Sequence, residues 1–450
     1  MLKRVLGAAD AGWLVAGNMV GAGIFITPGL VAGNLPGTLW PLAAWVVGGA
    51  LSLCGAAIYG ELGARLPRAG GDYQYLRVAF GPLWGFLTGW AAWIVTFSGA
   101  AAVMAIVTMD NVTTAWPLLA RLPDGLHRLL PAVVVIALTV ANIAGARIAG
   151  RTTAWLTILP VGGLAVLCVI GWFTGSATLE TSAWRSHAPM PGAESSTRIV
   201  VAFAAAMVPI LFTYSGWNAA AYVAGEIRRP ALNLARGLLL GTFGVCVFYV
   251  LFNVLLFAAV PHERLAGSTT AAAQAAQRYL GSGGERVLAV LIALAVLGSA
   301  NVTLMAGARI YYAMAVDGLA PRTLSRTNTA GVPALALGVG GLWTALLSLT
   351  GRIEALVNWA TLAILLLSAL AAASLVVLRR RGTSWDGEDN ADPPYRCPGY
   401  PWIPALYLLA ALGVAGASAV QDWRQALYGC LIVGAGVPVY ALVRRQGESP

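Results

Sequence analysis

The stretch GNMVGAGIFITPG, from Gly17 to Gly29, decides how the first long apolar run of the chain is interpreted. It contains four glycines, an asparagine, a threonine and a proline, where a membrane-spanning helix favours leucine and alanine. Glycine and proline are the poorest helix formers, so we expect the helix to unwind within the sequence VGAGIF. Unwound backbone at membrane depth survives only where it is buried in protein or lines a cavity. Close helix packing through the Gly17 and Gly21 pair is the alternative explanation for the glycines.

Composition places the chain among polytopic membrane proteins. Of its 450 residues, 58% are hydrophobic and 10% are charged, whereas a soluble domain carries about 25% charged residues. The mean hydropathy is +0.75. The net charge is +10, but the basic residues lie in short loops between apolar runs, which is typical of membrane topology and not of a nucleic-acid partner. We expect a lipid bilayer around the protein and no nucleic acid bound to it.

Twelve apolar segments are long enough to be helices that cross a bilayer, which takes about 20 residues. Only the short sequence TGRIE separates the ninth from the tenth, so eleven spans stay open as an alternative. The expected spans are residues 9–33, 39–61, 83–109, 129–148, 153–174, 199–222, 236–260, 286–313, 333–350, 353–377, 403–420 and 425–443.

The basic residues set the expected orientation. If the N-terminus is cytoplasmic, most of the 28 lysine and arginine residues fall on the cytoplasmic side, as the positive-inside rule requires. With twelve spans, both termini are then cytoplasmic. We expect a multi-pass protein of the cell membrane, that is, the inner or plasma membrane.

A second interrupted segment predicts how the helices are organised. The sixth span contains FTYSGWN, from Phe212 to Asn218, five spans after the first interruption. Transporters built from two inverted five-helix repeats form their substrate site where such discontinuous helices meet. We therefore predict an all-α polytopic fold with discontinuous helices 1 and 6. Repeat one covers about 9–174 and repeat two about 199–377, within a core of residues 1–402; helices 11 and 12 follow in 403–450.

The ends of broken helices favour a zwitterionic ligand. The N-terminus of a half-helix presents amide donors to an anion, and the C-terminus of a half-helix presents carbonyl groups to a cation. An amino acid carries one group of each kind.

Several motifs resemble those of the amino acid–polyamine–organocation permeases, particularly the neutral amino acid branch that includes the light chains of heteromeric transporters. They cover the chain in the family's order and are specific for the family but not for a substrate. These motifs are GNMVGAGIFITPG, LPRAGGDYQYLRVAFGPLWGFLTGW (66–90), FTYSGWNAAAYVAGEIRRPALNLARG (212–237), RIYYAMAVDGLAP (309–321) and PPYRCPGYPWIPAL (393–406).

The resemblance implies a set of substrate-binding residues. The substrate carboxylate would bind the backbone amides of Gly21, Ala22 and Gly23, where Ala22 replaces a frequent serine. The α-ammonium would bind carbonyl groups of Met19, Val20, Phe212 and Ser215. Phe212 is the expected outer gate, and Asn218 lies near the substrate side chain. A helix-packing hydrogen bond is the alternative role for Asn218.

Enzyme chemistry has little support in the sequence. The three histidines, His127, His187 and His262, fall in expected outer loops. Glu61 and Asp110 fall at span ends, so we expect a neutral cavity and small or medium neutral amino acids as substrates. We expect no catalytic residue, metal or cofactor. A membrane-embedded sensor is the non-transport alternative, and assembly as a homo-oligomer stays open.

The coupling mode is predicted from a missing residue. Some relatives carry a lysine in the fifth span that takes the place of a sodium ion, whereas this chain has Pro160 at about that position and Lys3 as its only lysine. We expect exchange. Proton or sodium symport, with sodium held near Ser299 or Thr303, and cationic amino acid or polyamine antiport remain alternatives.

Overall fold

A computed structural model describes residues 2–173, 196–268, 270–351, 353–382, 384–385, 388–389, 395–421 and 423–447. The described chain is almost entirely helical, apart from two-residue strands at Ser384–Trp385 and Glu388–Asp389. The helices of the first half are α1 (Ala8–Met19), α2 (Gly23–Asn34), α3 (Leu39–Arg65), α4 (Asp72–Phe80), α5 (Pro82–Ala91), η1 (Ala92–Thr96), α6 (Phe97–Ala115), η2 (Pro117–Arg121), α7 (Asp124–Ile143) and α8 (Ala146–Phe173). Those of the second half are α10 (Ser196–Thr213), α11 (Ala219–Tyr222), η3 (Ala224–Glu226), α12 (Pro230–Ala259), α13 (His262–Leu265), α14 (Ala271–Leu280), η4 (Gly281–Gly283), α15 (Gly284–Val316), η5 (Arg322–Ser325), α16 (Ala334–Ser348), α17 (Ile353–Arg381), α18 (Trp402–Gln421), α19 (Trp423–Gly434) and α20 (Gly436–Gly447).

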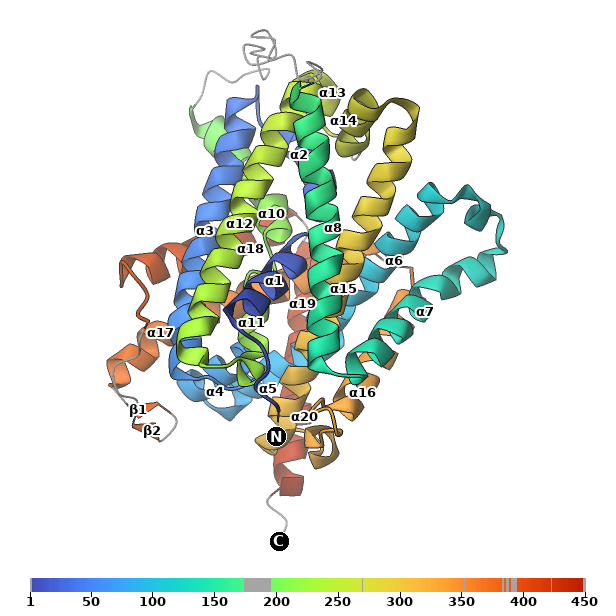
Figure 1. The fold of residues 1–450 in the computed structure, drawn as a ribbon. Coiled ribbons are helices and arrows are strands. Elements are labelled where there is room, and N and C mark those ends of the chain that lie inside the picture. The colour runs from blue at the N-terminus through green and yellow to red at the C-terminus, as the bar shows by residue number, and fades with distance from the viewer. Residues whose placement is uncertain are drawn as a thin grey trace.

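The long helices form one bundle around the two broken helices. Helix α15 packs against α6, and α12 packs against both α3 and α1. The N-terminal end and the end of α20 lie at the same end of the bundle (Figure 1). An even number of crossings gives this arrangement.

The apolar helices agree with an all-α polytopic membrane protein. Seven described helices are long and apolar enough to cross a membrane, and the bent pair α1 and α2 makes an eighth candidate. Four shorter apolar helices occur at Thr152–Val166, Ile199–Thr213, Ala334–Ser348 and Trp402–Ala417. Together these segments overlap the twelve expected spans. Helices α8 and α18 extend beyond these apolar segments, to 28 and 20 residues. The number twelve and the inverted repeats stay predictions.

Three boundaries differ from those expected. The turn between the fourth and fifth spans lies at Gly145, whose φ of 146° favours glycine, so α8 begins at Ala146 and not near residue 153. The last span is divided into α19 and α20 at Ala435. The third span contains one π-helical turn, Ala92–Thr96, between α5 and α6. Such turns recur at functional sites.

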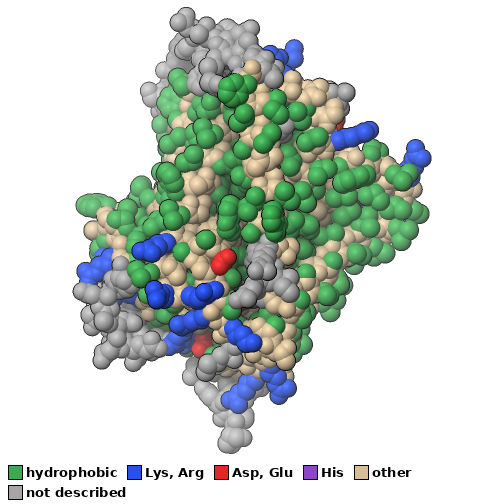
Figure 2. Space-filling view, viewed as in Figure 1, with side chains coloured by type: hydrophobic (Ala, Val, Ile, Leu, Met, Phe, Trp, Pro, Cys, Tyr) green, Lys and Arg blue, Asp and Glu red, His purple; other side chains and the backbone are tan. Residues whose placement is uncertain are grey.

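The molecular surface shows an apolar belt with basic residues gathered at one end. Figure 2 shows hydrophobic side chains over the long helices and most of the visible lysine and arginine near the end that carries the termini. Exposed leucine, valine and tryptophan side chains on these helices, such as Leu240, Trp155 and Leu409, fit contact with lipid.

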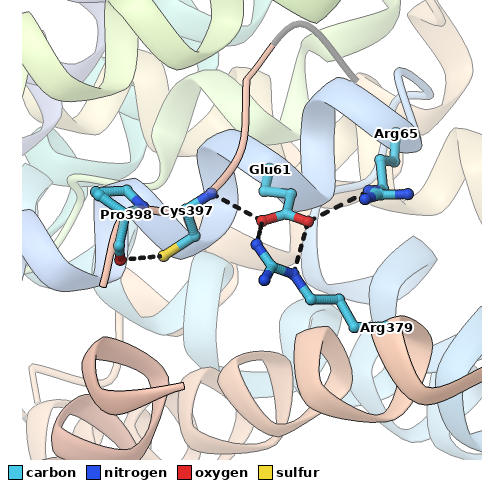
Figure 3. Close-up of polar contacts among 5 residues, drawn as sticks. All are labelled: Glu61, Arg65, Arg379, Cys397 and Pro398. Atoms are coloured by element: carbon cyan, nitrogen blue, oxygen red, sulfur yellow. Dashed lines mark hydrogen bonds and ion pairs between the residues drawn. The ribbon is translucent and has the colours of Figure 1, made fainter. Parts of the chain in front are cut away.

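Two ion pairs, each with a buried carboxylate, join segments at the end that carries the termini. Arg309 of α15 donates from Nε to Glu226 Oε1 at 2.6 Å and from Nη2 to Oε2 at 3.3 Å, and both side chains are 1% exposed. The second pair links α3 to α17. Arg379 donates from Nε to Glu61 Oε1 at 2.9 Å, and Glu61 is fully buried (Figure 3).

Glu61 gathers partners from three parts of the chain. Arg65, one turn along α3, lies 3.3 Å from Glu61 Oε1, and the backbone N–H of Cys397 donates to Oε2 at 2.8 Å (Figure 3). Both oxygens of the carboxylate are therefore in use. The acidic residue expected at a span end is a structural anchor between α3, α17 and the segment that leads into α18.

We predict that Arg309→Met lowers the thermal stability of the purified protein sharply, because it leaves Glu226 buried without its cation. Removing one partner of a buried pair costs about 3–5 kcal/mol. Arg77→Met is the matched control, since Arg77 and Asp317 form a pair at 3.1 Å whose side chains are 19% and 18% exposed. Thermal unfolding in detergent measures both. Equal melting temperatures for the two variants would contradict the anchoring role of the buried pair.

Candidate functional site at the two helix breaks

The first break lies between α1 and α2, whose axes differ in direction by 50°. Helix α1 ends at Met19 and α2 begins at Gly23. The N–H of Gly21 donates to Met19 O at 2.9 Å, which closes a tight turn. Within the described chain, the structure gives no hydrogen-bond acceptor for the N–H groups of Ala22, Gly23 and Ile24. These are the free donors that any helix N-terminus leaves.

The second break lies between α10 and α11. Helix α10 ends at Thr213, the next five residues form turns, and Ala219 starts a single helical turn. Gly216 has a φ of 100°, a conformation that disfavours a side chain. A Cβ at this position would lie 2.7–2.9 Å from atoms of Asn18. Glycine is therefore required both by the backbone conformation and by the approach of the first break.

The two breaks touch, and their carbonyl ends share a donor. Asn18 Nδ2 lies 3.5 Å from Gly216 O, and a Cβ on Gly23 would lie 2.7 Å from Thr213 Oγ1. The hydroxyl of Tyr249 on α12 donates to Met19 O at 2.6 Å and lies 3.4 Å from Thr213 O. This buried tyrosine thus caps the last carbonyl of α1 and lies close to that of α10.

Two hydroxyls of α15 bind Asn18, next to the first break. Ser299 Oγ donates to Asn18 O and Thr303 Oγ1 to Asn18 Oδ1, both at 2.9 Å. The fifth span approaches the same region through Thr157, because a Cβ on Gly17 would lie 2.5 Å from Thr157 Oγ1. Pro160, at the position of the family's lysine, is buried.

A cavity of about 80 Å³ lies beside the breaks. Asn18, Ser215, Gly216 and Asn218 line one side of it. The π-helical turn and its flanks line another, with Thr88, Ala92, Thr96, Phe97, Ala100 and Met104. A second hollow of about 50 Å³ shares Ser215, Gly216 and Asn218 and reaches toward α18. The larger cavity is the candidate substrate site because residues of the second break line it together with Asn18, which directly precedes the first break.

The eight sequence-predicted residues are not all at the cavity wall. Ser215 and Asn218 line it, while Met19, Val20, Gly21, Ala22 and Gly23 form the adjoining first break. Met19 and Val20 are buried, and the other three are half-buried. Phe212 does not line either hollow, and its side chain is 37% exposed. Its role as a gate stays a prediction.

Asp72 at the start of α4 also lines the cavity, which corrects the expectation that no carboxylate reaches it. The residue is 7% exposed, and its Oδ2 accepts a hydrogen bond from the Tyr222 hydroxyl at 2.7 Å. Burial is the larger effect and raises the pKa of the Asp72 carboxyl, whereas the hydrogen bond from Tyr222 acts to lower it. Asp72 could have been noticed in the sequence because it is a single acidic residue beside glycines and tyrosines, in GGDYQY, shortly after an apolar span.

Asn18, Tyr222 and Tyr249 were also missed from sequence. They are ordinary polar or aromatic residues in apolar helices, and nothing in their spacing brings them together. Their importance follows only from the contacts between the first break, α11 and α12.

A helical membrane bundle with two touching broken helices and a small cavity beside them, lined in part by polar residues, is typical of a secondary transporter. The chain belongs to the amino acid permease family, whose model matches residues 6–436. It is therefore an amino acid transporter of the membrane.

Curated relatives match over nearly the whole chain. The serine/threonine exchanger of Bacillus subtilis (strain 168) is 28% identical over 455 residues, which cover 100% of this chain and 98% of that protein. The human cystine/glutamate transporter and the human large neutral amino acids transporter small subunit 2 are each 28% identical. Both matches cover 98% of this chain, with 85% and 80% of those proteins.

We predict that Gly216→Ala lowers amino acid uptake at least about ten-fold at equal amounts of protein in the membrane. A side chain in the left-handed region costs about 1–2 kcal/mol, and here it also pushes Asn18 away from the second break. Gly244→Ala on α12 is the control, because a Cβ there meets no atom within 4 Å. Uptake by Gly216→Ala equal to that by Gly244→Ala would show that contact between the breaks is dispensable.

Proposed function

We propose that the protein exchanges small and medium neutral amino acids across the cell membrane by alternating access, with both termini in the cytoplasm. The observation that carries this proposal is the contact between two broken helices that leave unused donors and acceptors beside one small cavity. Each part of a neutral amino acid then has a matching group.

The substrate carboxylate binds at the start of α2. The N–H groups of Ala22, Gly23 and Ile24 lack an acceptor within the described chain, and the helix dipole adds a partial positive charge. The N–H of Gly21 is already engaged with Met19 O, so the donor set lies one residue further along than the resemblance implied.

The α-ammonium binds between carbonyl groups of both breaks. Met19 O accepts from Tyr249, and Phe212 O accepts from the N–H of Ser215 at 3.0 Å. Within the described chain, Val20 O and Ser215 O carry no such donor. These two carbonyls are the strongest candidates for an ammonium, and Phe212 O contributes through its second lone pair. Met19 O already accepts from both Tyr249 and Gly21, so it is no longer a candidate.

Neutral side chains fit the cavity better than cationic ones. Asp72 is a carboxyl at the cavity wall, but its Oδ2 already accepts a hydrogen bond from the Tyr222 hydroxyl. A guanidinium or ammonium that used it would have to displace the bond from Tyr222. The small volume of the cavity also favours short side chains.

We favour exchange because of the residues at position 160 and beside the first break. The fifth-span lysine is missing, and the hydroxyls of Ser299 and Thr303 already donate to Asn18. Each hydroxyl oxygen still has lone pairs for a cation, so the transport test below decides between exchange and sodium symport. The relative from Bacillus subtilis is named as an exchanger, which supports the same mode.

We predict that liposomes loaded with unlabelled substrate take up labelled serine several-fold faster than empty ones. A carrier that needs no ion recrosses slowly when empty, and bound amino acid on the far side speeds the return. The measurement uses purified protein under imposed sodium or proton gradients, with protein-free liposomes as the blank. Equal rates in loaded and empty liposomes, together with stimulation by either gradient, would replace exchange with symport.

We predict that alanine, serine and threonine compete for uptake, while arginine, lysine and diamines do not. A buried cation without a partner costs several kcal/mol. Asn218→Asp adds a carboxylate at the cavity wall and should give measurable inhibition by arginine. Strong inhibition of the wild-type protein by arginine would show that Asp72 is available to substrates.

A further inference from the structure

Asn218, Tyr222 and Asp72 form a hydrogen-bonded relay at the cavity. Asn218 donates from Nδ2 to the hydroxyl oxygen of Tyr222 at 2.9 Å, and that hydroxyl lies 2.7 Å from Asp72 Oδ2. The three residues come from the second break, from α11 and from α4. Asn218 and Asp72 both line the cavity, and Tyr222 lies between them.

The number of protons on each group decides which residue of this relay donates and which accepts. An ionised carboxylate only accepts hydrogen bonds, and a tyrosine hydroxyl has one proton to give. Tyr222 gives that proton to Asp72, so its oxygen can only accept from Asn218. Asn218 must therefore turn its NH₂ group toward Tyr222. The O and N of an amide have nearly the same shape, and the hydrogen-bond network is what distinguishes them.

The surroundings hold the relay in place. The ring of Tyr222 lies edge-on to Phe97 with centroids 4.9 Å apart. A Cβ on Gly71 would lie 2.5 Å from the same ring, so the space beside it is filled. Around Asp72 the titratable neighbours are the tyrosines Tyr59, Tyr75, Tyr222 and Tyr407. The hydroxyl of Tyr222 donates to Asp72 and favours the ionised carboxylate, whereas burial is the larger effect and raises the pKa of Asp72.

With its NH₂ group engaged, Asn218 presents its carbonyl oxygen to the cavity. Its side chain makes one hydrogen bond within the described chain, from Nδ2, and the residue is only half-buried. Oδ1 is thus an acceptor fixed in orientation at the wall of a small cavity.

We propose that Asp72 and Tyr222 are positioning residues that lock the amide of Asn218, so that the site selects amino acids whose short side chain donates a hydrogen bond. Hydroxyl side chains meet this requirement. Side chains that only accept hydrogen bonds are rejected, because two acceptors then face each other without a proton. This inference rests on the proposed function and adds a substrate class to it.

Two isosteric pairs of amino acids test the polarity of the site directly. Serine and 2-aminobutyrate differ by a hydroxyl in place of a methyl group, and O-methylserine and norvaline differ by an ether oxygen in place of a methylene. Competition against labelled alanine uptake gives the inhibition constants in proteoliposomes. We expect serine to inhibit about 2- to 10-fold better than 2-aminobutyrate, the effect of one neutral hydrogen bond. We expect O-methylserine to inhibit several-fold worse than norvaline.

Tyr222→Phe and Asp72→Asn should both free the amide of Asn218 from its fixed orientation. Without the Tyr222 hydroxyl, or with an amide that can donate at position 72, Asn218 can turn and offer Nδ2 to the cavity. The ratio of norvaline to O-methylserine inhibition constants should then rise to about one or above. A general structural defect would weaken both competitors alike and leave the ratio unchanged. Tyr75→Phe is the matched control, since it removes a buried tyrosine hydroxyl of α4 that makes no hydrogen bond to Asn218 or Tyr222 within the described chain.

The wild-type ratios alone can overturn the inference, whatever the variants do. Equal inhibition by O-methylserine and norvaline in the wild-type protein would show that no fixed acceptor faces the substrate. An unchanged ratio in whichever of Tyr222→Phe and Asp72→Asn takes up alanine would show that the relay does not set the polarity. Failure of the wild-type protein to transport any amino acid would instead contradict the proposed function.

Discussion

Backbone groups at membrane depth need partners, and the arrangement of the core follows from this constraint. A helix satisfies its own N–H and C=O groups, but each break frees several of them where water cannot replace the lost bonds. Tyr249, Asn18 and Ser299 supply part of the replacement, from α12, from α1 and from α15. Within the described chain, the N–H groups of Ala22, Gly23 and Ile24 and the carbonyls of Val20 and Ser215 stay without protein partners. Under the proposed function, a zwitterionic substrate would complete the hydrogen bonds that these groups leave open.

The sequence predicted the breaks well because their cause is local. Gly21, Gly23 and Gly216 lack side chains, and an interrupted helix is the direct consequence of glycine and proline within an apolar run. The order of the helices and the membership of the family were also predicted from the sequence. The turn at Gly145 was placed several residues too late because apolarity continues across it, so hydropathy could not locate the end of α7.

The missing parts of the site depend on contacts between distant segments. Asp72 follows a span within a short polar helix, and its sequence neighbours indicate a loop. Only the packing of α4 beneath α11 brings its carboxyl to Tyr222, 150 residues away. Asn18 and Tyr249 were hidden in the same way. By contrast, the charged residues Glu226 and Arg309 form a buried ion pair between segments and do not line the cavity.

The central claim is that the breaks recognise both charged groups of one amino acid. Thermal stabilisation of the purified protein by ligands tests it most directly, because a ligand that binds only the folded state raises the melting temperature. The account predicts stabilisation by serine and none by N-acetylserine, which lacks the ammonium, or by ethanolamine, which lacks the carboxylate. Equal stabilisation by serine and either analogue at the same concentration would contradict it.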